Sequence, residues 1–138
     1  APWRLDLWDA YQVRSLTEWA STLAAPPVER RQVSALALAG WWGPGNGFGP
    51  VNAEYSFGLV ATTEVALPPG EYRLLVTADD GIRAFVDGEP VIERWSAERP
   101  IATESALVEW SGTPRTIRIE YCQDGASRLW VRAEPLGP

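Results

Sequence analysis

Residues 78–88, Ala-Asp-Asp-Gly-Ile-Arg-Ala-Phe-Val-Asp-Gly, carry the clearest structural signal of the chain. The adjacent carboxylates Asp79-Asp80 follow an apolar run, and a short alternating run then leads to Asp87-Gly88. An Asp-Gly pair favours the positive φ angles that a two-residue hairpin turn requires. The stretch therefore predicts a hairpin with one strand over Ile82–Val86 and a returning strand over Pro90–Trp95.

Alternating or apolar runs, separated by glycine and proline, predict strands along most of the remaining chain. Tyr72–Thr77 and Thr116–Tyr121 alternate most clearly, while Val33–Ala39 is apolar on both parities and should be buried on both faces. The other expected strands are Trp3–Tyr11, Glu54–Val60, Thr62–Leu67, Glu104–Trp110 and Arg128–Ala133. Many short strands with frequent turns predict an all-β fold, an antiparallel β-sandwich of jelly-roll type.

One segment near the N-terminus, Ser15–Ala25, has the pattern of a short helix. Ser15 or Thr17 could cap it, and Pro26-Pro27 would end it. Its apolar residues share one helical face: Leu16, Trp19, Ala20 and Leu23. An irregular loop explains the segment equally well, so the sequence predicts at most one short helix.

Length and charge limit the classes of partner. A chain of 138 residues predicts a single domain over 1–138, and the absence of an initiating Met suggests a piece of a longer polypeptide. The net charge is −6 without a basic cluster, which argues against nucleic acid as a partner. Insertion of this domain into a membrane is not expected, because no apolar run approaches the roughly 18 residues required. The isolated domain is expected to be a monomer.

Histidine is absent and Cys122 is the only cysteine. These counts exclude an intrachain disulfide, a zinc site built on histidines or paired cysteines, and a histidine-dependent catalytic triad. Cys122 is expected to be a small buried hydrophobic residue, since no histidine can activate its thiol. Any metal must therefore use oxygen ligands, which favours calcium over zinc.

The ordered elements from Tyr55 to Glu134 resemble the PA14 family, a β-sandwich module with many carbohydrate-binding members at cell surfaces. The resemblance rests on a Pro-Gly turn at 68–70, a strand ending at Asp79-Asp80-Gly81, the Asp-Gly hairpin and the Trp that follows it. An Ile-x-Ile-Glu-Tyr strand at 117–121 and a final apolar strand complete the set. The part before Val51 fits the family more loosely.

The resemblance implies a calcium site at the two aspartates in lectin-like members. Neighbouring side chains of an extended strand point to opposite faces, so Asp79 and Asp80 reach one ion only if the backbone departs from β structure. The family implies a cis peptide between them and a second loop before the last strand. Because calcium needs six to eight oxygens, Gln123 and Asp124 are the expected further ligands, where the family often has Asn.

Turn chemistry is an equally weighted alternative for Asp79-Asp80-Gly81. Aspartate side chains bond nearby backbone amides, and Gly81 would then supply a positive φ. Many PA14 modules keep these aspartates without lectin activity. The same question applies to Asp124-Gly125, where a simple turn is the favoured reading.

Tryptophans are candidates for contacting a sugar, because the C–H face of a pyranose packs on an aromatic ring. Trp41 and Trp42 flank a glycine-rich loop that also holds Asn46 and Phe48, and one of the two tryptophans should be buried. The expected ligand-binding residues are Asp79, Asp80, Trp41, Trp42, Asn46 and Asp124. Core packing is favoured for Trp8, Trp95 and Trp110, whereas Trp130 has the parity of the second face of its sheet.

Three functions compete. The leading hypothesis is a non-catalytic carbohydrate-binding module of a bacterial cell-surface or secreted protein, with a glycan or polysaccharide as partner and Ca²⁺ as an optional cofactor. The alternative is a structural, protein-interaction or sensor module of a larger envelope protein. A glycosidase using Asp79, Asp80, Glu93 or Glu120 is disfavoured, because adjacent aspartates lack the carboxyl separation that glycoside hydrolysis needs.

Overall fold

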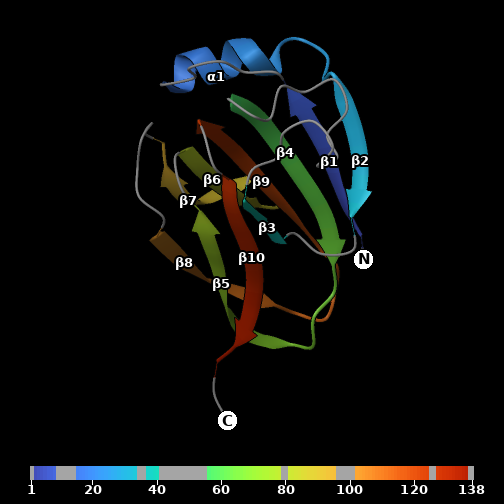
Figure 1. The fold of residues 1–138 in the computed structure, drawn as a ribbon. Coiled ribbons are helices and arrows are strands. Elements are labelled where there is room, and N and C mark those ends of the chain that lie inside the picture. The colour runs from blue at the N-terminus through green and yellow to red at the C-terminus, as the bar shows by residue number, and fades with distance from the viewer. Residues whose placement is uncertain are drawn as a thin grey trace.

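A computed structural model describes residues 2–8, 15–33, 37–40, 56–78, 81–95, 102–124 and 127–136 of the chain. Two antiparallel sheets pack face to face, and one short helix lies across one end (Figure 1). Within these residues the arrangement confirms the predicted all-β sandwich with at most one short helix near the N-terminus. Within the described residues, no helix combines the length and apolar character needed to cross a membrane.

The larger sheet has six strands in the order β2-β1-β4-β9-β6-β7. Every neighbouring pair in it is antiparallel. Its strands are β1 (Trp3–Trp8), β2 (Glu29–Val33), β4 (Ser56–Val65), β6 (Gly81–Val86), β7 (Glu89–Arg94) and β9 (Arg115–Asp124).

The smaller sheet has four strands in the order β3-β10-β5-β8, again antiparallel. Its strands are β3 (Ala37–Gly40), β5 (Gly70–Ala78), β8 (Ala102–Trp110) and β10 (Ser127–Pro135). Consecutive strands often lie in different sheets, so several connections cross from one sheet to the other at the ends of the sandwich.

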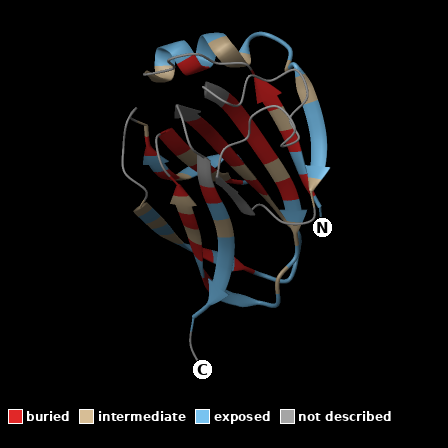
Figure 2. Ribbon diagram, in the orientation of Figure 1, coloured by how far each residue is buried: buried red, intermediate tan, exposed pale blue. Residues whose placement is uncertain are grey.

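The core fills the space between the sheets with alternate residues of each strand, visible as the banding in Figure 2. In β5, Tyr72, Leu74 and Val76 point inward as the alternation predicts, and their exposed fractions are 8%, 0% and 0%. Ile119 and Tyr121 of β9 face them from the other sheet and are fully buried. This burial is the main favourable term that holds the two sheets together.

The helix α1 (Leu16–Leu23) begins where the sequence predicts. Ser15 is its N-cap, and the Ser15 hydroxyl accepts a hydrogen bond of 3.1 Å from the backbone N–H of Glu18. Trp19 is fully buried against a second apolar cluster formed by Trp8, Val60 and Cys122, with Leu23 and Trp95 beside it. These strand residues point away from the main core, so α1 covers part of the outer face of the six-stranded sheet.

The Asp87-Gly88 hairpin between β6 and β7 is confirmed. Asp87 has φ 50° and Gly88 has φ 82°, as a two-residue turn of this type requires. The Asp87 carboxylate also accepts bonds from the Thr116 N–H and from Arg115. The bond from Thr116, and after it the bond from Arg115, hold the pKa of Asp87 below its usual value.

Three predicted strands are wrong in their boundaries. Val33–Ala39 is not one strand, because Val33 ends β2 in the six-stranded sheet whereas Ala37 begins β3 in the four-stranded sheet. Glu54–Val60 and Thr62–Leu67 are not separate strands: β4 runs without interruption over Ser56–Val65. Apolar content indicates a strand, but the partner strands decide where it ends and to which sheet it belongs.

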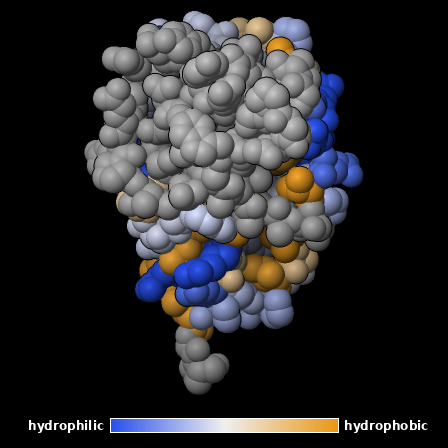
Figure 3. All heavy atoms as spheres, in the orientation of Figure 1, coloured by the Kyte–Doolittle hydropathy of each residue, from blue (hydrophilic) through white to orange (hydrophobic). Residues whose placement is uncertain are grey.

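The surface is mixed in character. Among the described residues, the exposed large hydrophobic side chains are Val28, Leu107, Trp130 and Leu136. Hydrophilic and hydrophobic side chains alternate on the part of the surface visible below the grey region in Figure 3. These side chains stand on different strands, since Leu107 lies on β8 and Trp130 on β10.

Candidate functional site

The flanks of both predicted ligand loops lie at one end of the sandwich. β5 ends at Ala78, which pairs with Leu129 of β10, while β6 begins at Gly81, which pairs with Cys122 of β9. β9 ends at Asp124, and β10 begins soon after at Ser127. The topology therefore brings the flanks of Asp79-Asp80 and of the Asp124 loop to the same end, where α1 also lies (Figure 1).

The tryptophan-rich segment is anchored at that end as well. Gly40, the last residue of β3, pairs with Ser127, and Ser56, the first residue of β4, pairs with Asp124. The chain between Gly40 and Ser56 therefore leaves and re-enters the sandwich beside the Asp124 loop. Sequence reasoning joined the Asp124 loop to the two aspartates by family resemblance and added the tryptophans for their aromatic rings. The register brings the flanks of all three segments to one end.

A buried arginine fixes the backbone immediately before the two aspartates. Arg94 of β7 is 9% exposed and donates from Nη2 to the Ala78 carbonyl at 2.7 Å. Its Nη1 pairs with Glu104 Oε1 of β8 at 3.2 Å. The ion pair neutralises the Arg94 charge locally, so Arg94 positions this strand end without leaving an unbalanced cation.

Gly81 is required by close packing and not by a special φ angle. A Cβ at Gly81 would lie 2.8 Å from Cys122 Sγ and 3.0 Å from Cδ2 of Trp95. Gly81 is absent from the glycines with positive φ, so the positive φ expected in the turn alternative is wrong at this residue. Because Gly81 has no side chain, β6 can lie directly against the ring of Trp95. The Trp95 ring in turn packs on Trp19 of α1, with 5.0 Å between the ring centroids.

Most of the predicted ligand residues fall in the segments between the described strands. Asp79, Asp80, Trp41, Trp42 and Asn46 lie outside the described residues, as do Phe48 and the peptide bond for which a cis form is expected. Gln123 and Asp124 are the last two residues of β9, where their backbones pair with Phe57 and Ser56.

The tryptophan predictions that fall on described residues are largely confirmed. Trp8 and Trp110 are buried, with exposed fractions of 8% and 1%. Trp95 is half-buried against the second cluster, and Trp130 is 37% exposed on the second face of its sheet. Cys122 is buried, as expected for a small hydrophobic residue.

Sequence reasoning missed an ionic network that joins α1 to the sheet. Glu120 of β9 is 3% exposed, and its Oε1 accepts bonds from Trp19 Nε1 at 3.0 Å and from Arg83 Nη2 at 2.7 Å. Its Oε2 accepts from Arg118 Nη2 at 2.8 Å. The alternation of β9 placed Glu120 on the outer face, but only the fold brings Trp19 over it.

The network gives Glu120 a structural role. Burial would raise the pKa of Glu120, but the hydrogen bonds from Arg118, Arg83 and Trp19 outweigh it and hold the pKa below the usual value. Both carboxylate oxygens are occupied by these donors. Glu120 is therefore unsuited to be the general acid of a glycosidase, because that carboxyl group must be protonated before it can donate a proton to the leaving-group oxygen.

The donors available at the candidate end fit a hard cation better than a soft one. Asp79, Asp80 and Asp124 offer carboxylates and Gln123 an amide oxygen, which is the ligand chemistry of calcium. The Ala78 carbonyl accepts a hydrogen bond from Arg94, so it is not counted among these oxygen donors. Within the described part of the chain, no group of three His, Cys, Asp or Glu side chains is placed to hold a metal.

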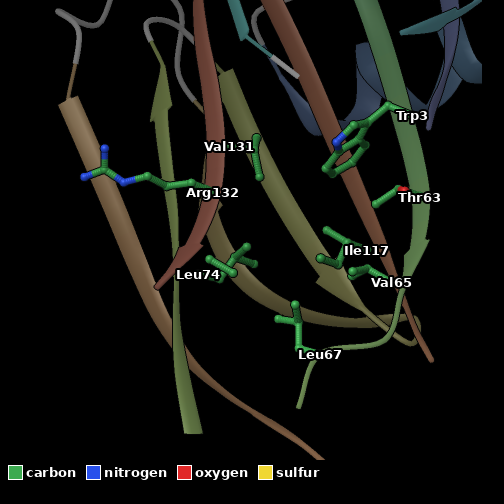
Figure 4. A pocket seen from close by; sticks show the side chains of 9 residues that line it. Trp3, Thr63, Val65, Leu67, Leu74, Ile117, Val131 and Arg132 are labelled. Carbon is green, nitrogen blue, oxygen red and sulfur yellow. The ribbon is translucent and has the colours of Figure 1, made fainter. Parts of the chain in front are cut away.

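An apolar cavity of roughly 170 Å³ opens between the sheets, away from this end (Figure 4). Trp3, Val65 and Ile117 point into it from the six-stranded sheet and Val131 from β10, while Arg132 extends away from it. Its lining holds none of the predicted ligand residues. It is therefore separate from the candidate site.

The comparisons with known proteins agree with this fold. The PA14 domain model matches residues 39–133. The PA14 domain of the MpAFP antifreeze protein superposes with a TM-score of 0.76 at 16% identity, covering 99% of this chain and 85% of that chain. No curated protein matches the sequence.

Two further solved structures bind sugars according to their descriptions. The PA14 sugar-binding domain of an RTX adhesin has a TM-score of 0.73 at 20% identity, covering 99% of this chain and 91% of that chain. The A domain of Epithelial Adhesin 9 from Candida glabrata, in complex with Galβ1-4GlcNAc, has a TM-score of 0.72 at 13% identity, covering 98% and 82%. At these identities the likeness establishes the shared fold.

Proposed function

Since the chain belongs to the PA14 domain family, we propose that it is a non-catalytic carbohydrate-binding module that holds a glycan through calcium. One observation carries the proposal: the strands that flank Asp79-Asp80 and the Asp124 loop end side by side at one end of the sandwich. Two chain segments rich in oxygen donors are needed for one calcium ion, because two carboxylates alone are too few.

Asp79, Asp80, Asp124 and Gln123 are the residues that would hold the ion. Bound calcium would supply open coordination positions for sugar hydroxyls. Arg94 and Gly81 do not touch the sugar in this proposal, but they fix the backbone on either side of the aspartates. Trp41, Trp42 and Asn46 follow β3 in the sequence and complete the proposed ligand-binding set.

The sugar-binding neighbours support a glycan as the ligand class, and their adhesin descriptions support a role outside the cell or at its surface. A catalytic role has less support among the described carboxylates. Glu120 is committed to its arginines, and Glu93 is exposed on β7.

Calcium binding to the EDTA-treated protein tests the proposal. Titration calorimetry should give a Kd in the micromolar to millimolar range, and saturating calcium should raise Tm by mass action. Asp80→Asn should weaken calcium binding by more than about tenfold, because it removes a charged ligand. Glycans from a printed panel should bind in calcium and not in EDTA.

A matched variant at the opposite end of the sandwich controls for charge. Glu71→Gln makes the same carboxylate-to-amide change on exposed β5 surface and should leave calcium binding unaltered. Absence of both heat and thermal shift in the unmodified protein would overturn the calcium site. If the glycan panel were also silent, the structural or protein-interaction module would become the better interpretation.

A further inference from the structure

The outer face of the four-stranded sheet presents an exposed tryptophan. Along β10, Leu129 is fully buried while the next residue, Trp130, is 37% exposed. Because neighbouring side chains of a strand point to opposite faces, Trp130 stands on the outer face. The described helix α1 packs against the other sheet, through Trp19 and its cluster, so it does not cover this face.

On the β5 side of Trp130 the residues of the row carry hydroxyl groups, whereas Ala37 of β3 pairs with Trp130 on the other side. Trp130 pairs with Thr77 of β5, and Thr77 pairs in turn with Thr103 of β8. The two threonine hydroxyls are exposed and lie 2.8 Å apart. We call this row of Trp130, Thr77 and Thr103 the Trp130 platform. With strands about 4.8 Å apart, its ends are separated by roughly 10 Å, which is enough for one sugar ring.

The Trp130 platform is continuous with the proposed calcium site. Thr77 precedes Asp79 by two positions in the sequence. The next row of paired residues is Leu129–Ala78–Ala102, and Ala78 is the residue directly before Asp79-Asp80. On the neighbouring strand, Trp130 follows closely after Ser127, where β10 leaves the Asp124 loop. A ligand that extends from the site along the outer face of the four-stranded sheet therefore lies within reach of this row.

We infer that the Trp130 platform is a second sugar subsite, which holds the next ring of a glycan chain bound at the proposed calcium site. The inference rests on the proposed function. A pyranose has C–H groups on its faces and hydroxyls around its rim. The negative face of an indole attracts such C–H groups, while the threonine hydroxyls can donate to and accept from the rim.

The pairing of an aromatic face with hydroxyls favours a glycan over a protein at this row. The centre of a protein interface is usually apolar and depleted of groups that must be desolvated. An apolar protein surface would remove water from the hydroxyls of Thr77 and Thr103 without replacing its hydrogen bonds. The hydroxyls of a sugar can take the place of that water. The platform would make the module select chains of two or more sugars over single sugars.

Binding of single sugars compared with chains tests the inference. The probes are galactose, glucose, mannose and xylose, each as the methyl glycoside and as the linear tetrasaccharide, titrated in calcium. The unmodified protein should bind at least one tetrasaccharide about tenfold more tightly than its methyl glycoside. Trp130→Ala should remove this advantage and leave the Kd of the methyl glycoside unchanged, while Trp130→Phe should keep part of it.

Leu107→Ala provides the matched control, because Leu107 is also an exposed apolar residue of the four-stranded sheet. It should alter neither Kd. Unchanged tetrasaccharide affinity in Trp130→Ala, with Asp80→Asn still weakening binding, would overturn the subsite and leave the proposed function standing. Self-association that Trp130→Ala abolishes would make a second copy the occupant and overturn it also. Absence of any sugar binding would overturn both proposals together.

Discussion

Replacing Glu120 with Gln should lower the free energy of unfolding by about 3 kcal/mol. The buried carboxylate faces Trp19, Arg83 and Arg118, all of which donate to it. The glutamine amide has the same shape but offers one oxygen and an NH₂ group with two N–H donors. Its NH₂ group would therefore face N–H donors of an arginine or of Trp19, with no acceptor between them. Two arginines would also lose their only anionic partner in this network.

The expected loss lies at the lower end of the range for broken buried pairs, because Arg118 is 43% exposed and can turn toward water. Urea unfolding monitored by far-UV circular dichroism measures it, with the slope m checked for constancy. Glu64→Gln, an exposed carboxylate on the neighbouring strand β4, is the control and should change stability by less than about 0.5 kcal/mol. Equal effects of the two substitutions would contradict a structural role for the network.

The same substitution should change the dependence of stability on pH. The pKa of Glu120 is lowered in the folded state, so its stabilising contribution is complete above the unfolded pKa of about 4.3. The contribution is lost as the pH falls through the lower folded pKa. The difference in unfolding free energy between the unmodified protein and Glu120→Gln should therefore be constant from pH 8 to about pH 5 and shrink in more acidic solution. A difference that does not change with pH would contradict this assignment.

Local signals explain which parts of the fold could be predicted from sequence. The Asp87-Gly88 hairpin depends on two residues that adopt positive φ, and the start of α1 depends on Ser15, which bonds Glu18 within one turn. β5 was predicted because its alternation reflects burial on a single face. In each of these elements, the residues that determine the structure are close together in the chain.

The features that could not be predicted from the sequence depend on pairing between distant parts of the chain. β2, with the sequence Glu-Arg-Arg-Gln-Val, is an edge strand that pairs only with β1 among the described strands, so its polar residues show no alternation. The Glu120 network joins residues that are 101 positions apart, Trp19 and Glu120. The candidate site depends on pairings of the same kind, since the register and not the local sequence brings the flanks of Asp79-Asp80 and Asp124 to one end.

Replacing Gly81 with Ala should destabilise the protein by about 1–3 kcal/mol and weaken calcium binding in the same variant. The new Cβ would lie 2.8 Å from Cys122 Sγ, and the ladder pairing of Gly81 with Cys122 prevents β6 from simply moving away. The Trp95 side chain cannot shift easily either, because its ring packs against Trp19 of α1. Thermal and urea unfolding measure the first effect and calorimetric titration the second.

A double variant tests whether this contact is the cause. Cys122→Ala removes Sγ, so Gly81→Ala should cost less in its presence, with a coupling of about 0.5–3 kcal/mol in the double-mutant cycle. Gly88→Ala is the matched control: a Cβ there meets nothing within 4 Å, and the strain arises from its φ of +82°. Its cost should therefore add to that of Cys122→Ala without coupling. Additive effects for Gly81→Ala would contradict close packing as the reason for this glycine. If Gly81→Ala loses both stability and calcium affinity, the packing of β6 against Cys122 and Trp95 sets the position of the aspartates that precede it.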